Sequence, residues 1–149
     1  MKKLTDKLYV RPQVAAEDIR SAKANGFATI INNRPDDEER GQPSAADNRA
    51  VAVAEGMGYT HIPVVPGQII ETQIRAFQDA LSKTDGPVLA HCKTGIRSAT
   101  LYVLGEVLDG RMRKDEVAPL GTRLGLDLTG AVKWLEMHAR LTGKPSTLI

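Results

Sequence analysis

Cysteine, aromatic residues and long apolar runs are all scarce in this 149-residue sequence. Its single cysteine excludes an internal disulfide framework. Aromatic residues make up 4% of the chain, so the core must be built mainly from Ala, Val, Leu and Ile. No apolar run approaches the roughly 18 residues that a membrane-spanning helix needs. The 20 basic and 18 acidic residues leave a net charge of +2, which is too small to indicate a nucleic-acid-binding surface. We therefore expect neither a membrane nor a nucleic acid as partner.

The rest of the composition is that of an ordinary globular protein. Hydrophobic residues at 42% and charged residues at 26% exclude a disordered chain, and the length predicts one domain over residues 1–149. The basic start of the chain, residues 1–7, is not followed by an apolar stretch, so it does not resemble a signal peptide. We expect a cytoplasmic protein in which Cys92 is a reduced thiol.

Strand and helix patterns alternate along the chain. Short β-prone runs lie at 8–10, 27–31, 59–65 and 88–90, and helical patterns at 15–24, 44–55, 70–81, 96–108, 115–124 and 128–139. Apolar strands separated by helices predict an α/β fold, a single domain with a mainly parallel sheet of four to five strands flanked by helices. The helix at 96–108 is apolar nearly all round and should lie in the middle of the molecule. Residues 143–147 are typical of a frayed chain end.

The carboxyl ends of the parallel strands are where such sheets bind ligands. Three loops follow those ends, at 32–40, 65–70 and 91–98. The third connects a buried strand directly to the central helix and reads His91-Cys92-Lys93-Thr94-Gly95-Ile96-Arg97-Ser98. Backbone N–H groups at a helix N-terminus point outward and the helix dipole favours negative charge, so this loop is a candidate anion site.

The residue types in this loop add chemistry to the anion site. Gly95 permits the tight turn that brings backbone amides close to a ligand, and the guanidinium of Arg97 can bind an oxyanion in a bidentate manner. Cys92 lies at the strand end, where the same positive field should lower its pKa. We expect a nucleophilic thiolate that faces an oxyanion, with Ser98 hydrogen-bonded to the sulfur. The alternative, a small buried cysteine without a reactive role, does not explain the surrounding residues.

The loop resembles the HCxxGxxRS signature of cysteine-dependent protein phosphatases, but it is one residue shorter between the cysteine and the arginine. The chain as a whole resembles the bacterial beta-lactamase-hydrolase-like phosphatase domain family. The resemblance rests mainly on the loop and on Asn32-Asn33-Arg34-Pro35. It implies a fold similar to that of the dual-specificity phosphatases and an orienting role for His91. Members of that family also occur fused to a persulfide dioxygenase domain, which implies a partner of that type.

Two enzyme activities are compatible with these residues. The spacing from Cys92 to Arg97 is similar to the CxxGxR loop of rhodanese-type sulfurtransferases, and a shorter loop should fit a sulfane sulfur better than a phosphoryl group. In sulfur transfer, Cys92 takes the sulfane sulfur of thiosulfate or a persulfide and becomes a persulfide itself. In the alternative, a tyrosine- or dual-specificity-like phosphatase, Cys92 forms a phosphocysteine. Either way, Arg97 and the amides of residues 93–97, those of Lys93, Thr94, Gly95, Ile96 and Arg97, bind the small anionic sulfur or phosphate substrate.

The two activities differ in their need for a general acid. Ester hydrolysis requires protonation of the departing alkoxide, whereas a thiolate or sulfite leaves without it. The resembling phosphatases carry an aspartate about thirty residues before the cysteine, where this chain has no carboxylate between residues 64 and 70. We therefore expect sulfur transfer, and for the phosphatase we expect Asp36 or Asp37 as the acid. Arg34, just before them, either contacts the anion or pairs with this acidic run.

Neither activity requires a cofactor, and no metal site is expected. His91 and Cys92 are adjacent on a strand and point to opposite faces, while His61 and His138 have no ligand spacing with them. His91 should instead hydrogen-bond to the backbone and orient the thiol, as the resemblance implies. A third alternative is a non-catalytic module that binds an anion or a phosphopeptide, although binding alone does not require the nucleophile.

Overall fold

A five-stranded sheet forms the centre of the computed structural model, which describes residues 1–143. The strand order is β1-β2-β5-β3-β4, and β1 pairs antiparallel with β2 while the other pairs are parallel. The strands are β1 (Lys2–Lys3), β2 (Leu8–Arg11), β3 (Thr29–Asn32), β4 (Gly58–His61) and β5 (Val88–His91). The prediction of an α/β domain with a mainly parallel sheet is confirmed.

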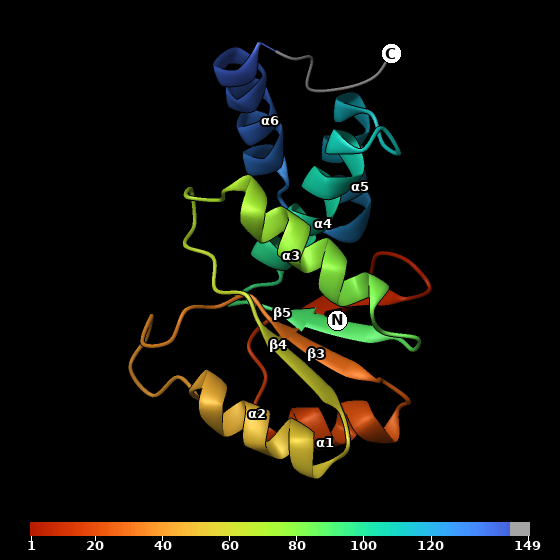
Figure 1. The fold of residues 1–149 in the computed structure, drawn as a ribbon, viewed down its shortest axis with the longest axis vertical. Coiled ribbons are helices and arrows are strands. Elements are labelled where there is room, and N and C mark those ends of the chain that lie inside the picture. Colours follow the sequence, from red (N-terminus) through yellow and green to blue (C-terminus); the bar gives the residue numbers. More distant parts are fainter. Residues whose placement is uncertain (144–149) are drawn as a thin grey trace.

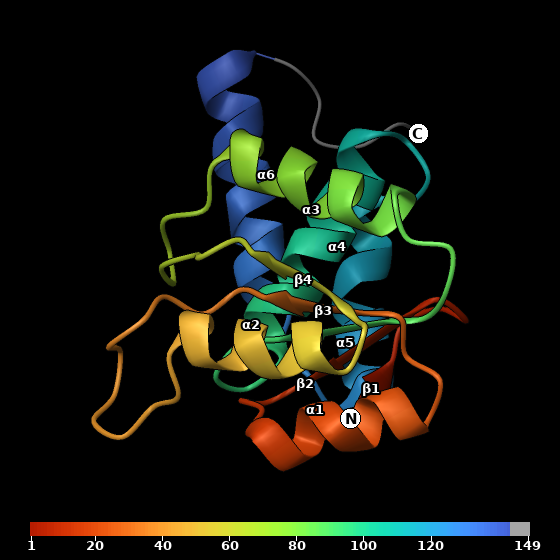
Figure 2. The ribbon, with the colours of Figure 1, turned by 60° about the horizontal axis from the view of Figure 1, so that its bottom comes forward.

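Helices cover both faces of this sheet (Figures 1 and 2). One face carries α1 (Ala16–Ala24) and α2 (Ala45–Ala54), and the other carries α3 (Glu71–Ser82), α4 (Ile96–Leu108), α5 (Val117–Leu124) and α6 (Thr129–Thr142). A short 3₁₀ helix, η1 (Lys114–Glu116), leads into α5. None of the helices in residues 1–143 is long and apolar enough to cross a membrane.

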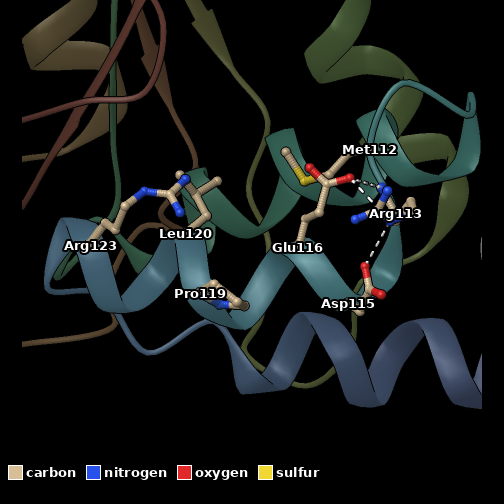
Figure 3. Close-up of a pocket in the computed structure, with 7 residues that line it drawn as sticks. All are labelled: Met112, Arg113, Asp115, Glu116, Pro119, Leu120 and Arg123. Atoms are coloured by element: carbon tan, nitrogen blue, oxygen red, sulfur yellow. Dashed lines mark hydrogen bonds and ion pairs between the residues drawn. The ribbon is translucent and has the colours of Figure 1, made fainter.

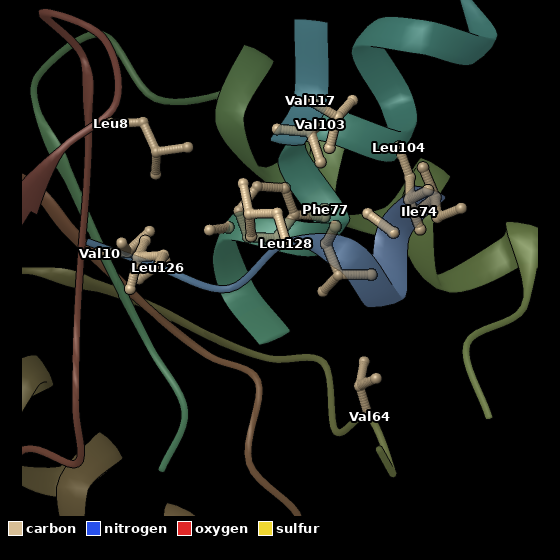
Figure 4. Packing of buried hydrophobic residues seen from close by; sticks show 14 of the residues in the cluster. Leu8, Val10, Val64, Ile74, Phe77, Val103, Leu104, Val117, Leu126 and Leu128 are labelled. Carbon is tan, nitrogen blue, oxygen red and sulfur yellow. The ribbon is translucent and has the colours of Figure 1, made fainter. Parts of the chain in front are cut away.

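The two faces of the sheet bury separate apolar clusters because successive strand residues point to opposite sides. Ile30 and Leu89 pack with residues of α1 and α2, whereas their neighbours Ile31 and Ala90 pack with α3, α4 and α6. Figure 4 shows part of the larger cluster, in which Phe77 of α3 is fully buried. These two layers fix the sheet, and with it the positions of the loops that follow its strands.

Helix α4 lies at the centre of the larger layer. Eight of its residues are buried, on all sides of the helix, and its bounds match the predicted 96–108. A helix that is apolar all round is stable only where every side is covered, and here it packs on β5, α3 and α6. This central placement gives its N-terminus, and the loop before it, a rigid support.

The strand ends differ from the predictions for local reasons. The predicted strand 59–65 ends at His61, because Pro63 has no N–H to donate to a neighbouring strand. The pattern also missed β1, which has only two residues, both exposed and charged. In α5, Pro119 lies in the first turn, where a missing N–H costs little. The predicted frayed end, 143–147, lies outside the described residues except for Gly143.

Candidate active site

The loop between β5 and α4 places Cys92 at the carboxyl edge of the sheet. Cys92 is fully buried, and the backbone N–H of Gly95 donates a hydrogen bond to its sulfur at 3.0 Å. Gly95 has φ +95°, in the left-handed region, and precedes the first residue of α4. An N–H donor and a helix N-terminus both stabilise negative charge on the sulfur. The geometry suits a thiolate nucleophile.

Arg97 is the second residue of the same helix and is held by residues from two other loops. Its Nη1 and Nη2 donate to the two carboxylate oxygens of Glu38 at 2.8 and 2.9 Å, and Nη1 also donates to the carbonyl of Val64 at 2.8 Å. A guanidinium has five N–H donors. Within residues 1–143, these three bonds leave the Nε–H and one Nη2–H of Arg97 for a ligand. That pair forms one edge of the planar fork, suited to bidentate contact with an oxyanion.

Glu38 is a site residue that the sequence patterns did not single out. Its hydrogen bonds from Arg97 lower the pKa of its carboxyl group, and the Nε of Arg34, at 2.8 Å, adds to this, while burial opposes it. Glu38 is therefore ionised when it contacts Arg97. The next residue, Glu39, lies 3.1 Å from the Nζ of Lys93. Two carboxylates of the acidic run 36–39 thus form ion pairs with the loop that carries Cys92: Glu38 with Arg97, and Glu39 with Lys93.

Arg34 is almost fully buried, with 2% of its surface exposed, and it contacts this acidic run. It donates to Glu38 and, through Nη1, to Oε1 of Gln13 at 3.1 Å, while its Nη2 lies 4.0 Å from Glu39. Of the two predicted alternatives, pairing with the acidic run is the arrangement that the structure contains. Arg34 positions Glu38, which in turn holds Arg97.

Asp36, the predicted general acid, has a different contact. Its Oδ1 accepts a hydrogen bond from the backbone N–H of Ala45, the first residue of α2, at 2.8 Å. A carboxylate at a helix N-terminus satisfies a free N–H and is stabilised by the helix dipole. Asp37, the second candidate, has φ +61° in the turn that follows. The carboxylate that the structure brings to Arg97 is that of Glu38.

The expected hydrogen bond from Ser98 to the sulfur of Cys92 is replaced by a different contact. It is fully buried, and its hydroxyl donates to Oδ1 of Asn33 at 2.8 Å. The same Asn33 side chain donates to the carbonyl of Ile62, and its backbone N–H donates to that of His91. Asn33 therefore ties α4 to the ends of β4 and β5. It belongs to the Asn-Asn-Arg-Pro run, which was the only sequence signal for it.

The ring of His91 is fully buried beneath the loop. Within the described residues, neither ring nitrogen has a hydrogen-bond partner of normal geometry, and the expected bond to the backbone is reduced to a weak interaction with the backbone of Cys92. Burial lowers the pKa of His91 to about 4, while the nearby backbone of Cys92 opposes this in part. The ring is neutral in the folded protein at neutral pH.

This burial predicts a pH dependence of stability. A folded-state pKa of about 4, below the ordinary 6.5, means that the unfolded chain binds the proton first as the pH falls. The free energy of unfolding should therefore decrease by about 2 kcal/mol from His91 between about pH 7.5 and about pH 5. Urea titrations across this range test it. The His91→Gln variant should lose that part of the pH dependence, and an unchanged slope would contradict the prediction.

Residues 1–143 contain no group of three or more His, Cys, Asp or Glu side chains that could hold a metal ion. A cavity of about 370 Å³ lies beside η1 and α5 (Figure 3). Its lining includes Met112 and Leu120, together with Arg113, which pairs with Asp115. None of its lining residues belongs to the loop with Cys92.

The fold and the loop together define a class of protein, the α/β domains with a cysteine-phosphatase-like fold. The sequence pattern of the family "Beta-lactamase hydrolase-like protein, phosphatase-like domain" matches residues 1–109. The chain belongs to this family.

Curated relatives match more than nine tenths of this chain. The beta-lactamase hydrolase-like protein of Agrobacterium fabrum is 46% identical over 137 residues, which is 92% of this chain and 32% of that protein. The protein of the same name from Xylella fastidiosa is 42% identical over 96% of this chain and 33% of its own length. The chain thus spans about a third of the length of these relatives.

Solved structures show the same fold. A phosphatase candidate from Neisseria meningitidis has a TM-score of 0.79 and 32% identity, with 89% of this chain and 93% of that chain covered. TpbA of P. aeruginosa, solved in complex with phosphotyrosine, has a TM-score of 0.64 and 16% identity, with 87% and 78% covered. The second likeness concerns the fold alone.

Proposed function

We propose that this chain is a cysteine-dependent phosphatase that hydrolyses phosphate monoesters, and not in the first place the sulfurtransferase that the loop spacing favours. The observation that carries the proposal is the Gly95 N–H on the Cys92 sulfur, with Arg97 held beside it at the start of α4. The family to which the chain belongs and the phosphatase candidate with the same fold support it. The mechanism needs a reduced thiol, which the cytoplasm maintains, so a cytoplasmic location is part of the proposal.

The reaction takes place in two steps. The phosphoryl oxygens bind the amides of the loop and the remaining edge of Arg97, which neutralise charge as it develops. The Cys92 thiolate attacks phosphorus, a P–S bond forms, the P–O bond to the organic group breaks, and the alkoxide or phenolate departs and takes a proton from water. Water then attacks the phosphocysteine, which releases inorganic phosphate and restores the thiolate.

The ionised state of Glu38 restricts the substrates. A carboxylate whose pKa is lowered by Arg97 has no proton to give to a departing alkoxide. Esters whose leaving groups are weak bases, such as aryl phosphates, depend least on protonation of the leaving group. We therefore propose aryl phosphate monoesters as the substrates that this site hydrolyses best.

Sulfur transfer is the second candidate, and two features favour it. Four residues separate Cys92 from Arg97, as in rhodanese-type loops, and the carboxylate at the site is ionised. Here the thiolate attacks the sulfane sulfur of thiosulfate, the S–S bond breaks and sulfite leaves. A second thiolate then takes the sulfur from the persulfide on Cys92. A persulfide dioxygenase-type partner belongs to this candidate alone.

The covalent intermediate distinguishes the two. The protein is mixed with an aryl phosphate or with thiosulfate, quenched in acid, and weighed by intact mass spectrometry. We expect a phosphoryl group on Cys92 from the ester, with release of inorganic phosphate on continued turnover. Addition of one sulfur atom from thiosulfate, removed by a thiol reductant, together with no phosphoryl adduct, would replace the phosphatase with the sulfurtransferase.

A further inference from the structure

A cavity adjoins the loop with Cys92 and extends away from it toward the last helix. It has a volume of about 410 Å³ and lies between the start of α4, the segment before α3, and α6. Two residues of the anion site, Ile96 and Arg97, line its near end. Its exposed lining is largely apolar, with Ile69, Trp134 and Met137, although Asp127 and Lys133 also line it. The cavity and the anion site are thus continuous.

The cavity has a fixed wall and an adaptable one. The indole N–H of Trp134 donates to the carbonyl of Ile69 at 2.8 Å, and its ring stacks on His138 with centroids 4.7 Å apart. These contacts hold the segment before α3 against α6, which Figure 1 shows side by side. Met137 is 49% exposed and unbranched, so its side chain can adjust to the shape of a ligand.

From this geometry we propose that the cavity binds the organic group of the substrate, and that this group is apolar and larger than a single aromatic ring. The proposal rests on the phosphatase function, since the anion site fixes the phosphoryl end. The size follows from the volume, because a closed apolar cavity of roughly 150 Å³ suffices for benzene. A fused bicyclic aryl group attached to the phosphate would fill the space beyond Ile96 and cover the apolar wall.

Binding of two phosphonates, which cannot be hydrolysed, tests this directly. Naphthylmethylphosphonate carries the bicyclic group and methylphosphonate does not. By calorimetry, we expect the first to bind at least about tenfold more tightly, the scale on which an apolar pocket discriminates between ligands. Trp134 is the only tryptophan of the chain, so its fluorescence should change with naphthylmethylphosphonate and remain constant with methylphosphonate.

Gly130 offers a variant that fills the cavity without disturbing the fold. It lines the cavity on α6, and a Cβ built there meets no atom within 4 Å. Gly130→Leu should remove the preference for naphthylmethylphosphonate and leave the affinity for methylphosphonate unchanged. Gly130→Ala, with the same backbone change and a small side chain, should retain most of the preference.

The outcomes separate this inference from the proposed function. Equal affinities for both phosphonates in the native protein would overturn the cavity proposal and leave the phosphatase intact. A preference that survives Gly130→Leu would overturn it too, because the bicyclic group would then bind elsewhere. If neither phosphonate binds, both the cavity proposal and the proposed function fail.

Discussion

Replacement of Cys92 with serine should reduce turnover of an aryl phosphate by about 10⁴-fold or more, the scale seen when a nucleophile is removed. The hydroxyl of serine is a much weaker nucleophile than the sulfur of cysteine, and the Gly95 N–H and the start of α4 would face it in the same way. The fold should survive, because a serine oxygen is smaller than the sulfur and can accept the same hydrogen bond. The loss is therefore one of chemistry.

Steady-state phosphate release and a urea titration measure the two effects separately. Thr94→Ser is a matched control, since Thr94 is exposed in the same loop and its Oγ1 accepts only a long bond, 3.4 Å, from the N–H of Ile96. The serine hydroxyl keeps that acceptor, so activity should stay within about twofold. Residual activity of Cys92→Ser close to that of the control would remove Cys92 from the mechanism and revive the non-catalytic binding module.

The parts of this site that could be predicted from sequence are those in which neighbouring residues determine the geometry. The bounds of α4 followed from a segment that is apolar nearly all round the helix, with Gly95 before it. The position of Cys92 at a strand end followed from the short apolar run at 88–90, which the structure extends by one residue. A short loop between a buried strand and a buried helix has few possible conformations. The anion site could therefore be predicted from the sequence alone.

The parts that could not be predicted depend on contacts between distant segments. Arg97 and Glu38 lie 59 positions apart, and Ser98 and Asn33 lie 65 apart. They meet because β3 and β5 are neighbours in the sheet, so the loops after both strands leave the same edge. The three loops were expected at this edge, but four consecutive carboxylates at 36–39 give no sign of which one faces the arginine.

The backbone conformation of residues 36–38 determines which carboxylate faces Arg97. The bond from Ala45 N to Asp36 directs the first carboxylate to the start of α2, and the left-handed conformation of Asp37 turns the chain between the two. Glu38 then faces Arg97 and Arg34 together. A loop in which one residue has a left-handed backbone conformation has no periodic sequence pattern. Hydrophobic spacing therefore gives no information about the structure of this loop.

Arg97→Lys should lower kcat/KM for an aryl phosphate by about 10²- to 10³-fold. An ammonium group retains the positive charge, but it cannot bind Glu38 and the carbonyl of Val64 while it also offers two parallel N–H groups to a phosphoryl group. The loss should appear mainly in kcat, because the bidentate contact strengthens as charge develops on the equatorial oxygens. A change confined to KM would assign Arg97 to uniform substrate binding instead.

Glu38→Gln separates positioning from charge in the same measurement. The amide oxygen of glutamine can still accept one N–H of Arg97, so kcat/KM should fall by only about tenfold. In the double variant with Arg97→Lys, the second substitution should add little, because the contact that Glu38 provides is already lost. Full additivity of the two losses would show that Glu38 acts independently of Arg97. Its carboxylate would then have a role other than holding the guanidinium in place for the phosphoryl oxygens.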